Sequence, residues 1–169
     1  MKAWFTAVRA FFYSTGFIAL WGWLALNVRR YDARLGIGVP AWAVPGGVVV
    51  ILFGAVVCLA CIGTFVVRGR GTPAPFDAPR EFVAFGPYRY VRNPMYLGGL
   101  GVMLGFGLYL RSFAILLLGA GFFLAAFIFV LAYEEPHLRS VFGATYKEYC
   151  GSVTRWIPRV PHSHAPPQR

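Results

Sequence analysis

The chain has 169 residues, of which 58% are hydrophobic and only 13% are charged, and its mean hydropathy is +0.60. Soluble domains carry about 25% charged residues, so this composition excludes an ordinary soluble domain and indicates a membrane protein. The net charge of +10 does not indicate a nucleic-acid partner, because the basic residues lie between hydrophobic runs and form no single stripe. We therefore expect one membrane domain that binds no nucleic acid.

Four runs without charged residues predict an all-α integral membrane protein with about four transmembrane helices. The runs cover residues 10–28, 36–67, 93–110 and 112–133. A helix needs about 20 apolar residues to cross the hydrocarbon core, so three runs are long enough and the third is slightly short. We predict that the third and fourth runs form a tight hairpin around Arg111 and Ser112.

Both runs of the predicted hairpin are rich in glycine. Gly101 and Gly105 have the spacing that lets two membrane helices approach closely. We expect the glycines of the third run to face Gly119 and Gly121 of the fourth, either for packing or to leave room for a ligand. The glycines of the third run are Gly98, Gly99, Gly101, Gly105 and Gly107.

The segment GPYRYVRN, residues 86–93, precedes the third run and is predicted to be a turn at its mouth. Pro94 disfavours helical geometry at Asn93 and is itself suited to the first turn of a helix. A helix that begins here presents free backbone N–H groups, which favour an anion. Arg89 and Arg92 add positive charge to the same turn.

Glu134 and Glu135 follow the fourth run, and the hairpin topology places them beside the 86–93 turn. Spacing alone leaves three interpretations: the acids complement the dipole of the next helix, balance nearby arginines, or form one wall of a polar pocket. Such a pocket suits a zwitterionic or cationic ligand that carries its own carboxylate. Aromatic faces in the turn would hold a sulfonium or ammonium centre by cation–π attraction.

After residue 133, apolar residues recur at helical spacing between charges, which predicts an amphipathic helix in the interface or over the pocket. These residues are Leu138, Val141, Phe142, Tyr146 and Tyr149. Residues 1–160 are predicted to form a single domain, and residues 161–169 a flexible tail.

Charge asymmetry and cysteine spacing complete the predictions from the residues alone. Most cations fall on one side of four crossings, so the positive-inside rule places both termini in the cytoplasm. Four cations fall on the other side: Arg29, Arg30, Arg34 and Arg111. Cys58 and Cys61 have no accompanying second ligand pair, so we expect buried thiols and no metal site.

Two motifs of this chain resemble those of a known family. GPYRYVRNPMYLG and, after the hairpin, YEEPHLRSVFGATYKEYCGSVTRWIP resemble the isoprenylcysteine carboxyl methyltransferase and phospholipid methyltransferase superfamily of integral-membrane enzymes. The resemblance spans about residues 79–159, whereas residues 1–67 match only in hydropathy. It implies methyl transfer from S-adenosylmethionine, with S-adenosylhomocysteine as product, to a lipid-borne or hydrophobic acceptor at the cytoplasmic membrane face.

The resemblance also implies a set of site residues. Those that would hold the cofactor are Phe82, Val83, Tyr88, Arg92, Asn93, Tyr96, Leu97, Glu134 and Glu135. For an amine nucleophile, Glu135 and Tyr96 are the candidate catalytic residues, as proton acceptors. Asn93 stands where many prenylcysteine methyltransferases have histidine, and residues 130–133 lack the arginine expected before the acidic pair. These departures favour the phospholipid branch but leave both a phospholipid amine and an isoprenoid or prenylcysteine-like carboxylate open as acceptors.

Two other functions compete with this interpretation. The tyrosine-rich tail that ends in Ile-Pro is similar to the membrane tail of NADPH-dependent sterol reductases, although those proteins are usually longer. A small four-helix transporter or scaffold is the non-enzymatic alternative. Transporters normally carry an ionisable residue such as Asp, Glu, Lys, Arg or His within a crossing, and none of the four runs contains any of these five. The oligomeric state stays open.

Overall fold

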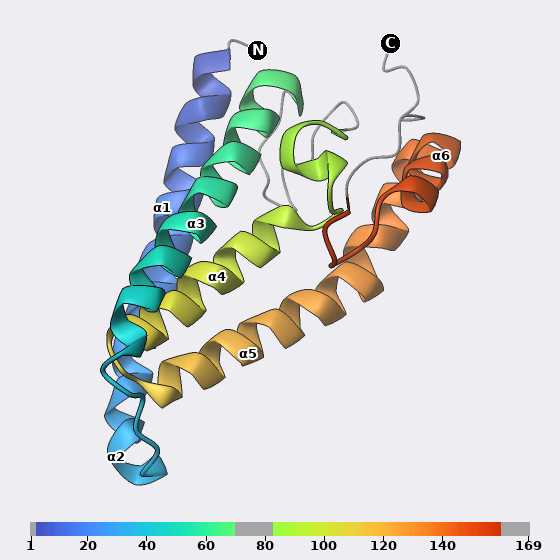
Figure 1. Cartoon of the computed structure of the whole chain (residues 1–169). Helices are drawn as coiled ribbons and strands as arrows, with labels where there is room; N and C mark the ends of the chain where they lie inside the picture. Colours follow the sequence, from blue (N-terminus) through green and yellow to red (C-terminus); the bar gives the residue numbers. More distant parts are fainter. Residues whose placement is uncertain (1–2, 70–82, 160–169) are drawn as a thin grey trace.

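The computed structural model describes residues 3–69 and 83–159, and these residues form an all-helical protein (Figure 1). The α-helices are α1 (Ala3–Val28), α2 (Asp32–Leu35), α3 (Ala43–Thr64), α4 (Pro94–Tyr109), α5 (Phe113–Phe129) and α6 (Glu135–Ser152). The 3-10 helices are η1 (Arg29–Tyr31) and η3 (Gly86–Arg89), and the π-helical turns are η2 (Phe65–Gly69) and η4 (Val130–Glu134). Phe82 and the predicted flexible tail, residues 161–169, lie outside the described residues.

Three helical stretches are long and apolar enough to cross a membrane, and α4 is a shorter apolar helix. The long stretches are Phe11–Leu35, Ala43–Val67 and Phe113–Ser152. The predicted helical membrane architecture is therefore confirmed. Pro94 begins α4, as predicted, because its fixed φ suits the first helical position and its missing N–H is not needed there.

The third of these stretches joins α5, η4 and α6 into one helix of 40 residues. At about 1.5 Å per residue, the part before the break at Gly143 is about 45 Å long, which is longer than the hydrocarbon core of about 30 Å. The charge-free part of this stretch ends at Tyr133, and Glu134 is the first charged residue after it. Gly143 has φ 53° and ψ −121°, which interrupts α6 and redirects its second half. Glycine accepts this backbone conformation without a Cβ clash.

The two ends of the bundle have different contents. In Figure 1 the chain descends through α1, ascends through α3, descends through α4 and ascends through α5. The start of α1, η3 and α6 therefore share one end, which we term the loop end. The opposite end, which we term the hairpin end, contains α2 and the connection between α4 and α5 at residues 110–112.

Glycines bring the backbones of α3 and α4 into direct contact. A Cβ on Gly54 would lie 2.5 Å from the carbonyl oxygen of Gly98, and one on Gly105 would lie 2.7 Å from that of Gly47. The packing interpretation is thus confirmed, but the expected partner was wrong for part of the set. Gly98, Gly101 and Gly105 share one helical face, and that face meets α3.

The other hairpin glycines divide between contact with the neighbouring helix and open space. Gly99 and Gly107 approach α5, where they meet Phe122 and Leu116, and Gly119 approaches α4. A Cβ on Gly121 would meet no atom within 4 Å. Gly99, Gly107 and Gly119 therefore lie between α4 and α5, as expected, but each meets a larger side chain instead of a facing glycine.

The predicted hairpin is present, and its polar groups bind backbone atoms. The Ser112 hydroxyl accepts a hydrogen bond from the Ile115 N–H at 3.2 Å, which caps α5. The Asp32 Oδ1 accepts a second bond, from the Ala114 N–H at 2.8 Å. Arg111 has φ 55°, and its Nε donates to the carbonyl of Val39 at 3.0 Å. The polar side chains at the hairpin end therefore satisfy backbone N–H and carbonyl groups.

Candidate active site

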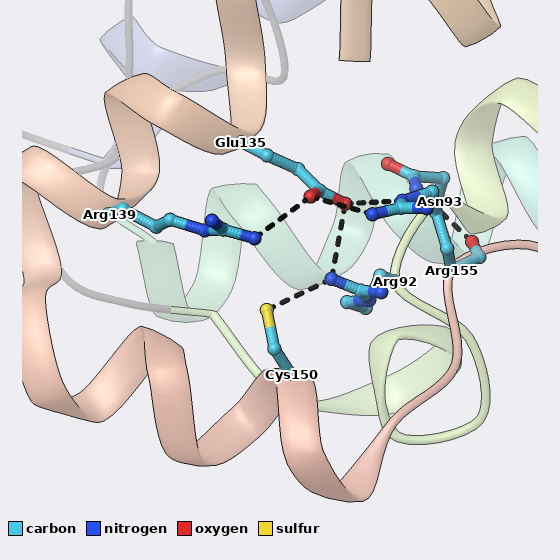
Figure 2. Close-up of polar contacts among 6 residues, drawn as sticks. All are labelled: Arg92, Asn93, Glu135, Arg139, Cys150 and Arg155. Atoms are coloured by element: carbon cyan, nitrogen blue, oxygen red, sulfur yellow. Dashed lines mark hydrogen bonds and ion pairs between the residues drawn. The ribbon is translucent and has the colours of Figure 1, made fainter. Parts of the chain in front are cut away.

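Glu135 is the centre of a cluster of basic residues at the loop end (Figure 2). Arg155 donates to both carboxylate oxygens of Glu135, from Nε at 2.6 Å and from Nη2 at 3.0 Å. The Nη1 of Arg92 lies 3.1 Å from Oε1, and the Nη2 of Arg139 lies 3.5 Å from Oε2. Arg92 Nη1 also donates to the Cys150 sulfur at 2.9 Å. We term Glu135 and its three arginines the Glu135 cluster.

The arginines keep Glu135 ionised despite its burial. Burial alone would raise the pKa of the Glu135 carboxyl, but the hydrogen bonds from Arg155 and the nearby charge of Arg92 lower it below its ordinary value. The same hydrogen bond with Glu135 raises the pKa of Arg155. Glu135 is only 4% exposed, and its two oxygens are committed to arginine donors. The electrostatics therefore make Glu135 a poor proton acceptor.

Glu134 is one residue away but has a different environment. Its Oε2 accepts a hydrogen bond from the Tyr96 hydroxyl at 2.9 Å. Burial raises the pKa of Glu134, the hydrogen bond from Tyr96 lowers it, and the charge of Glu135 raises it, with a net increase. Within the described residues no cation lies at ion-pair distance from Glu134. Adjacent helical positions point about 100° apart, so the two acids reach different partners.

The polypeptide after α6, residues 153–159, returns to the loop before α4, and we term it the C-terminal segment. The N–H of Arg92 donates to the carbonyl of Thr154, and the N–H of Arg159 donates to that of Tyr90, both at 2.9 Å. The side-chain amide of Asn93 donates to the carbonyl of Arg155 at 3.1 Å. Three bonds thus fix this segment across the start of α4.

Asn93 precedes α4 but does not cap it. Its side chain makes no hydrogen bond to the first turn of the helix, and its Nδ2 instead donates to the carbonyl of Arg155. The first N–H groups of α4 therefore receive no side-chain cap, and they retain the partial positive charge of a helix N-terminus. This agrees with the predicted anion-favouring turn.

Trp156, in the C-terminal segment, lies among aromatic side chains of α4 and α5. Its ring stacks on Phe127 at a centroid distance of 5.8 Å, and it meets Phe123 edge-on at 5.0 Å. It also meets Tyr96 edge-on at 6.4 Å. Trp156 therefore brings an aromatic surface close to the Tyr96–Glu134 pair.

The remaining predicted site residues occupy the same end of the protein. Val83 is buried, and Leu97 is half-buried in the first turns of α4. The carbonyl of Tyr88 accepts from the Tyr149 hydroxyl at 2.7 Å, and its ring meets Phe65 edge-on at 5.4 Å. Tyr88 thus joins the loop to both α6 and the end of α3. Their proposed contacts with a cofactor stay predictions.

Sequence reasoning assigned no role to Arg139, Cys150, Arg155 or Trp156. The sequence does contain a signal for one of them, because Arg139 lies four residues after Glu135, where helical side chains meet. Arg155 and Trp156 lie 20 or more residues from the acidic pair, and their positions depend on the interruption at Gly143. No local spacing indicates that return.

The comparisons with known proteins identify the family. A model of the phospholipid methyltransferase family matches residues 42–145, which is more than half of the chain. The chain belongs to the phospholipid methyltransferase family. No match was found among the curated proteins. The matched region begins at α3, earlier than the motif resemblance, and stops before the C-terminal segment.

The family establishes the reaction class. The protein is a membrane-embedded methyltransferase that uses S-adenosylmethionine, and its family implies a lipid substrate. This selects the methyltransferase interpretation over the NADPH-dependent reductase and the transporter or scaffold. The matched region includes Arg92, Tyr96, Glu134 and Glu135.

Proposed function

We propose that this methyltransferase transfers the methyl group to the amine of a membrane lipid, at the loop end of the bundle. The observation that carries the proposal is the half-buried Glu134 carboxylate, which contacts Tyr96 and has no cationic partner within the described residues. A carboxylate of this kind attracts an ammonium group and repels a carboxylate acceptor. The positive-inside bias of the sequence supports placing this end in the cytoplasm.

Arg92 and the start of α4 fit one end of S-adenosylmethionine. The Nε of Arg92 is buried and has no hydrogen-bond partner within the described residues. A buried guanidinium N–H favours an anionic acceptor, and the uncapped first turn of α4 favours one as well. We propose that these donors hold the carboxylate of the cofactor. Contacts of Glu134 or Glu135 with its amine or ribose hydroxyls are further predictions.

In the proposed reaction, the side chains of the protein orient the two substrates, supply charge and accept a proton. When bound, S-adenosylmethionine supplies a methyl group on a sulfonium, whose sulfur leaves with the electron pair of the C–S bond. We propose that Glu134 binds the lipid ammonium and removes its proton, which frees the nitrogen lone pair to form the new C–N bond. The pKa of Glu134 is raised whereas that of Glu135 is lowered, so the Glu134 carboxylate is the stronger base of the two. Aromatic side chains around Tyr96 exclude water.

A labelling experiment tests the acceptor. Purified protein is placed in vesicles that contain either phosphatidylethanolamine or a farnesylated cysteine, with S-adenosylmethionine labelled in its methyl group. We expect label on the amine lipid. Label on the cysteine carboxylate alone, or on neither lipid, would reject the proposed acceptor.

Calorimetry with S-adenosylhomocysteine tests the cofactor site separately. Arg92→Met removes the buried guanidinium and should weaken binding about 10- to 100-fold, the range for a hydrogen bond to a charged group. Arg139→Met is the matched control, because Arg139 contacts the same carboxylate but its side chain is 63% exposed. Equal losses in both variants would attribute the effect to the Glu135 cluster instead of to a cofactor contact.

A further inference from the structure

The indole N–H of Trp156 is a polar group that the proposed mechanism does not use. Its nitrogen is buried and has no hydrogen-bond partner within the described residues. The ring itself is well packed, against Phe123 and Phe127 of α5. The ring of Trp156 is therefore fixed by its packing, whereas its N–H makes no hydrogen bond within the described residues.

A buried donor without a partner destabilises the folded protein, because it gives up its hydrogen bond to water. Buried tryptophans usually find a partner for this group, since phenylalanine provides a ring without the cost. The aromatic contacts of Trp156 need only a ring. A hydrogen-bond acceptor that binds beside the ring would supply the missing partner of this N–H.

The position of Trp156 relative to the membrane indicates which ligand lies there. Phe127 is seven residues before Glu134 on one continuous helix, which is about 10 Å along the helix axis toward the hairpin end. Phe123 is one turn farther again. The Glu135 cluster, by contrast, begins outside the charge-free span. The indole thus packs against the charge-free part of α5, next to the acidic pair, on the side from which a lipid would approach the site.

We propose that the Trp156 N–H donates a hydrogen bond to the oxygen linkage of the lipid acceptor, next to the amine that Glu134 binds. This inference rests on the proposed amine acceptor and deepens it. Tyr96 connects Glu134 with Trp156, since its hydroxyl donates to Glu134 and its ring meets the ring of Trp156. The site then recognises an amine together with an oxygen-bearing linker, which distinguishes a headgroup lipid from a simple long-chain amine. Trp156 is in this way a specificity-determining residue.

Trp156→Phe tests this role, because it keeps a ring among Phe123 and Phe127 and removes only the donor. Two acceptors are compared, phosphatidylethanolamine and hexadecylamine, which has no oxygen. The variant should raise KM for phosphatidylethanolamine at least about ten-fold, the factor for one lost hydrogen bond. KM for hexadecylamine and the affinity for S-adenosylhomocysteine should stay unchanged. Thermal stability should be equal or higher, since an unpaired donor is removed.

Trp21→Phe is the matched control, because Trp21 also packs edge-on against a phenylalanine of α5, with a centroid distance of 4.9 Å from Phe122. Trp21→Phe should leave KM unchanged for both phosphatidylethanolamine and hexadecylamine. An unchanged KM for phosphatidylethanolamine in Trp156→Phe, an equal rise for both amines, or a loss of cofactor affinity would each overturn the inference. If the wild type methylates neither amine, the proposed acceptor itself is rejected, and the inference is rejected with it.

Discussion

The two ends of the α4–α5 hairpin use polar side chains in different ways. At the hairpin end, Asp32, Arg111 and Ser112 bind backbone N–H or carbonyl groups. At the loop end, Arg92, Glu134 and Glu135 bind other side chains. Backbone groups at a helix end need partners in any fold, so the contacts at the hairpin end are explained by stability alone.

The loop end has more polar groups than its helix ends require. It retains two buried donors without partners in the described residues, on Arg92 and Trp156, and a half-buried acid without a cation there, Glu134. Such groups cost stability unless a ligand satisfies them. In a chain with few charges, buried groups without partners therefore indicate a candidate ligand site better than the number of polar contacts does.

The largest expected effect lies at the loop end. Glu134→Gln keeps an oxygen for Tyr96 but removes the proposed proton acceptor, so kcat should fall about 10²- to 10⁴-fold. The thermal midpoint in detergent should change little. Glu148→Gln, an exposed acid of α6, is the control and should retain full activity. Near-normal kcat in Glu134→Gln would remove the functional distinction between the two ends.

Disruption of the glycine contact between α3 and α4, which lies between the two ends, should have the next largest effect. Gly54→Ala places a Cβ 2.5 Å from a backbone oxygen of α4, so the helices must separate, at a cost of about 3 kcal/mol. We expect a lower thermal midpoint and reduced activity together, since α4 carries Tyr96. Gly46→Ala is the matched control, because a Cβ there meets nothing within 4 Å. Equal stability of the two variants would contradict the close packing of α3 on α4.

A smaller effect is expected at the hairpin end. Asp32→Ala removes the oxygen that accepts from the Ala114 N–H, which should lower the free energy of unfolding by about 1 kcal/mol. The kcat of the folded protein should stay unchanged. Chemical or thermal denaturation, with activity normalised to folded protein, measures both quantities. A selective fall in kcat would show that this end also takes part in the reaction.

The smallest expected effect is on the pH dependence of stability, which distinguishes Glu135 from Glu134. The lowered pKa of Glu135 means that its contribution to stability is present above its unfolded pKa, about 4.3, and is lost as pH falls through the folded value. In Glu135→Gln this acid-dependent loss should disappear from the thermal midpoint. The raised pKa of Glu134 acts in the opposite direction, since its contribution is lost as pH rises. A profile unchanged by Glu135→Gln would contradict the ion pairs of the Glu135 cluster.

Much of this architecture follows from the sequence. Charge-free runs predict the crossings because burying charge in hydrocarbon is costly, and Pro94 and Ser112 mark helix starts through local backbone chemistry. The meeting of Arg92 with Glu135 follows from hairpin topology, which brings the loop and the end of α5 together. These predictions depend on local or neighbouring elements.

The remaining features depend on backbone geometry that spacing does not reveal. The apolar pattern of 138–149 indicates one continuous amphipathic helix, whereas Gly143 interrupts it with a positive φ. This change of direction brings Arg155 to Glu135 and Trp156 to Phe127. Similarly, a glycine-rich helix has several faces without side chains, and sequence does not select which face meets α3.

Phe127, Glu134 and Glu135 stand on one continuous helix, and the π-helical turn η4 (Val130–Glu134) lies between Phe127 and Glu135. The helical register therefore ties the spacing of the two adjacent acids to that of the aromatic ring that Trp156 contacts. A shift of this helix along its axis would carry the aromatic contact and both carboxylates by the same amount.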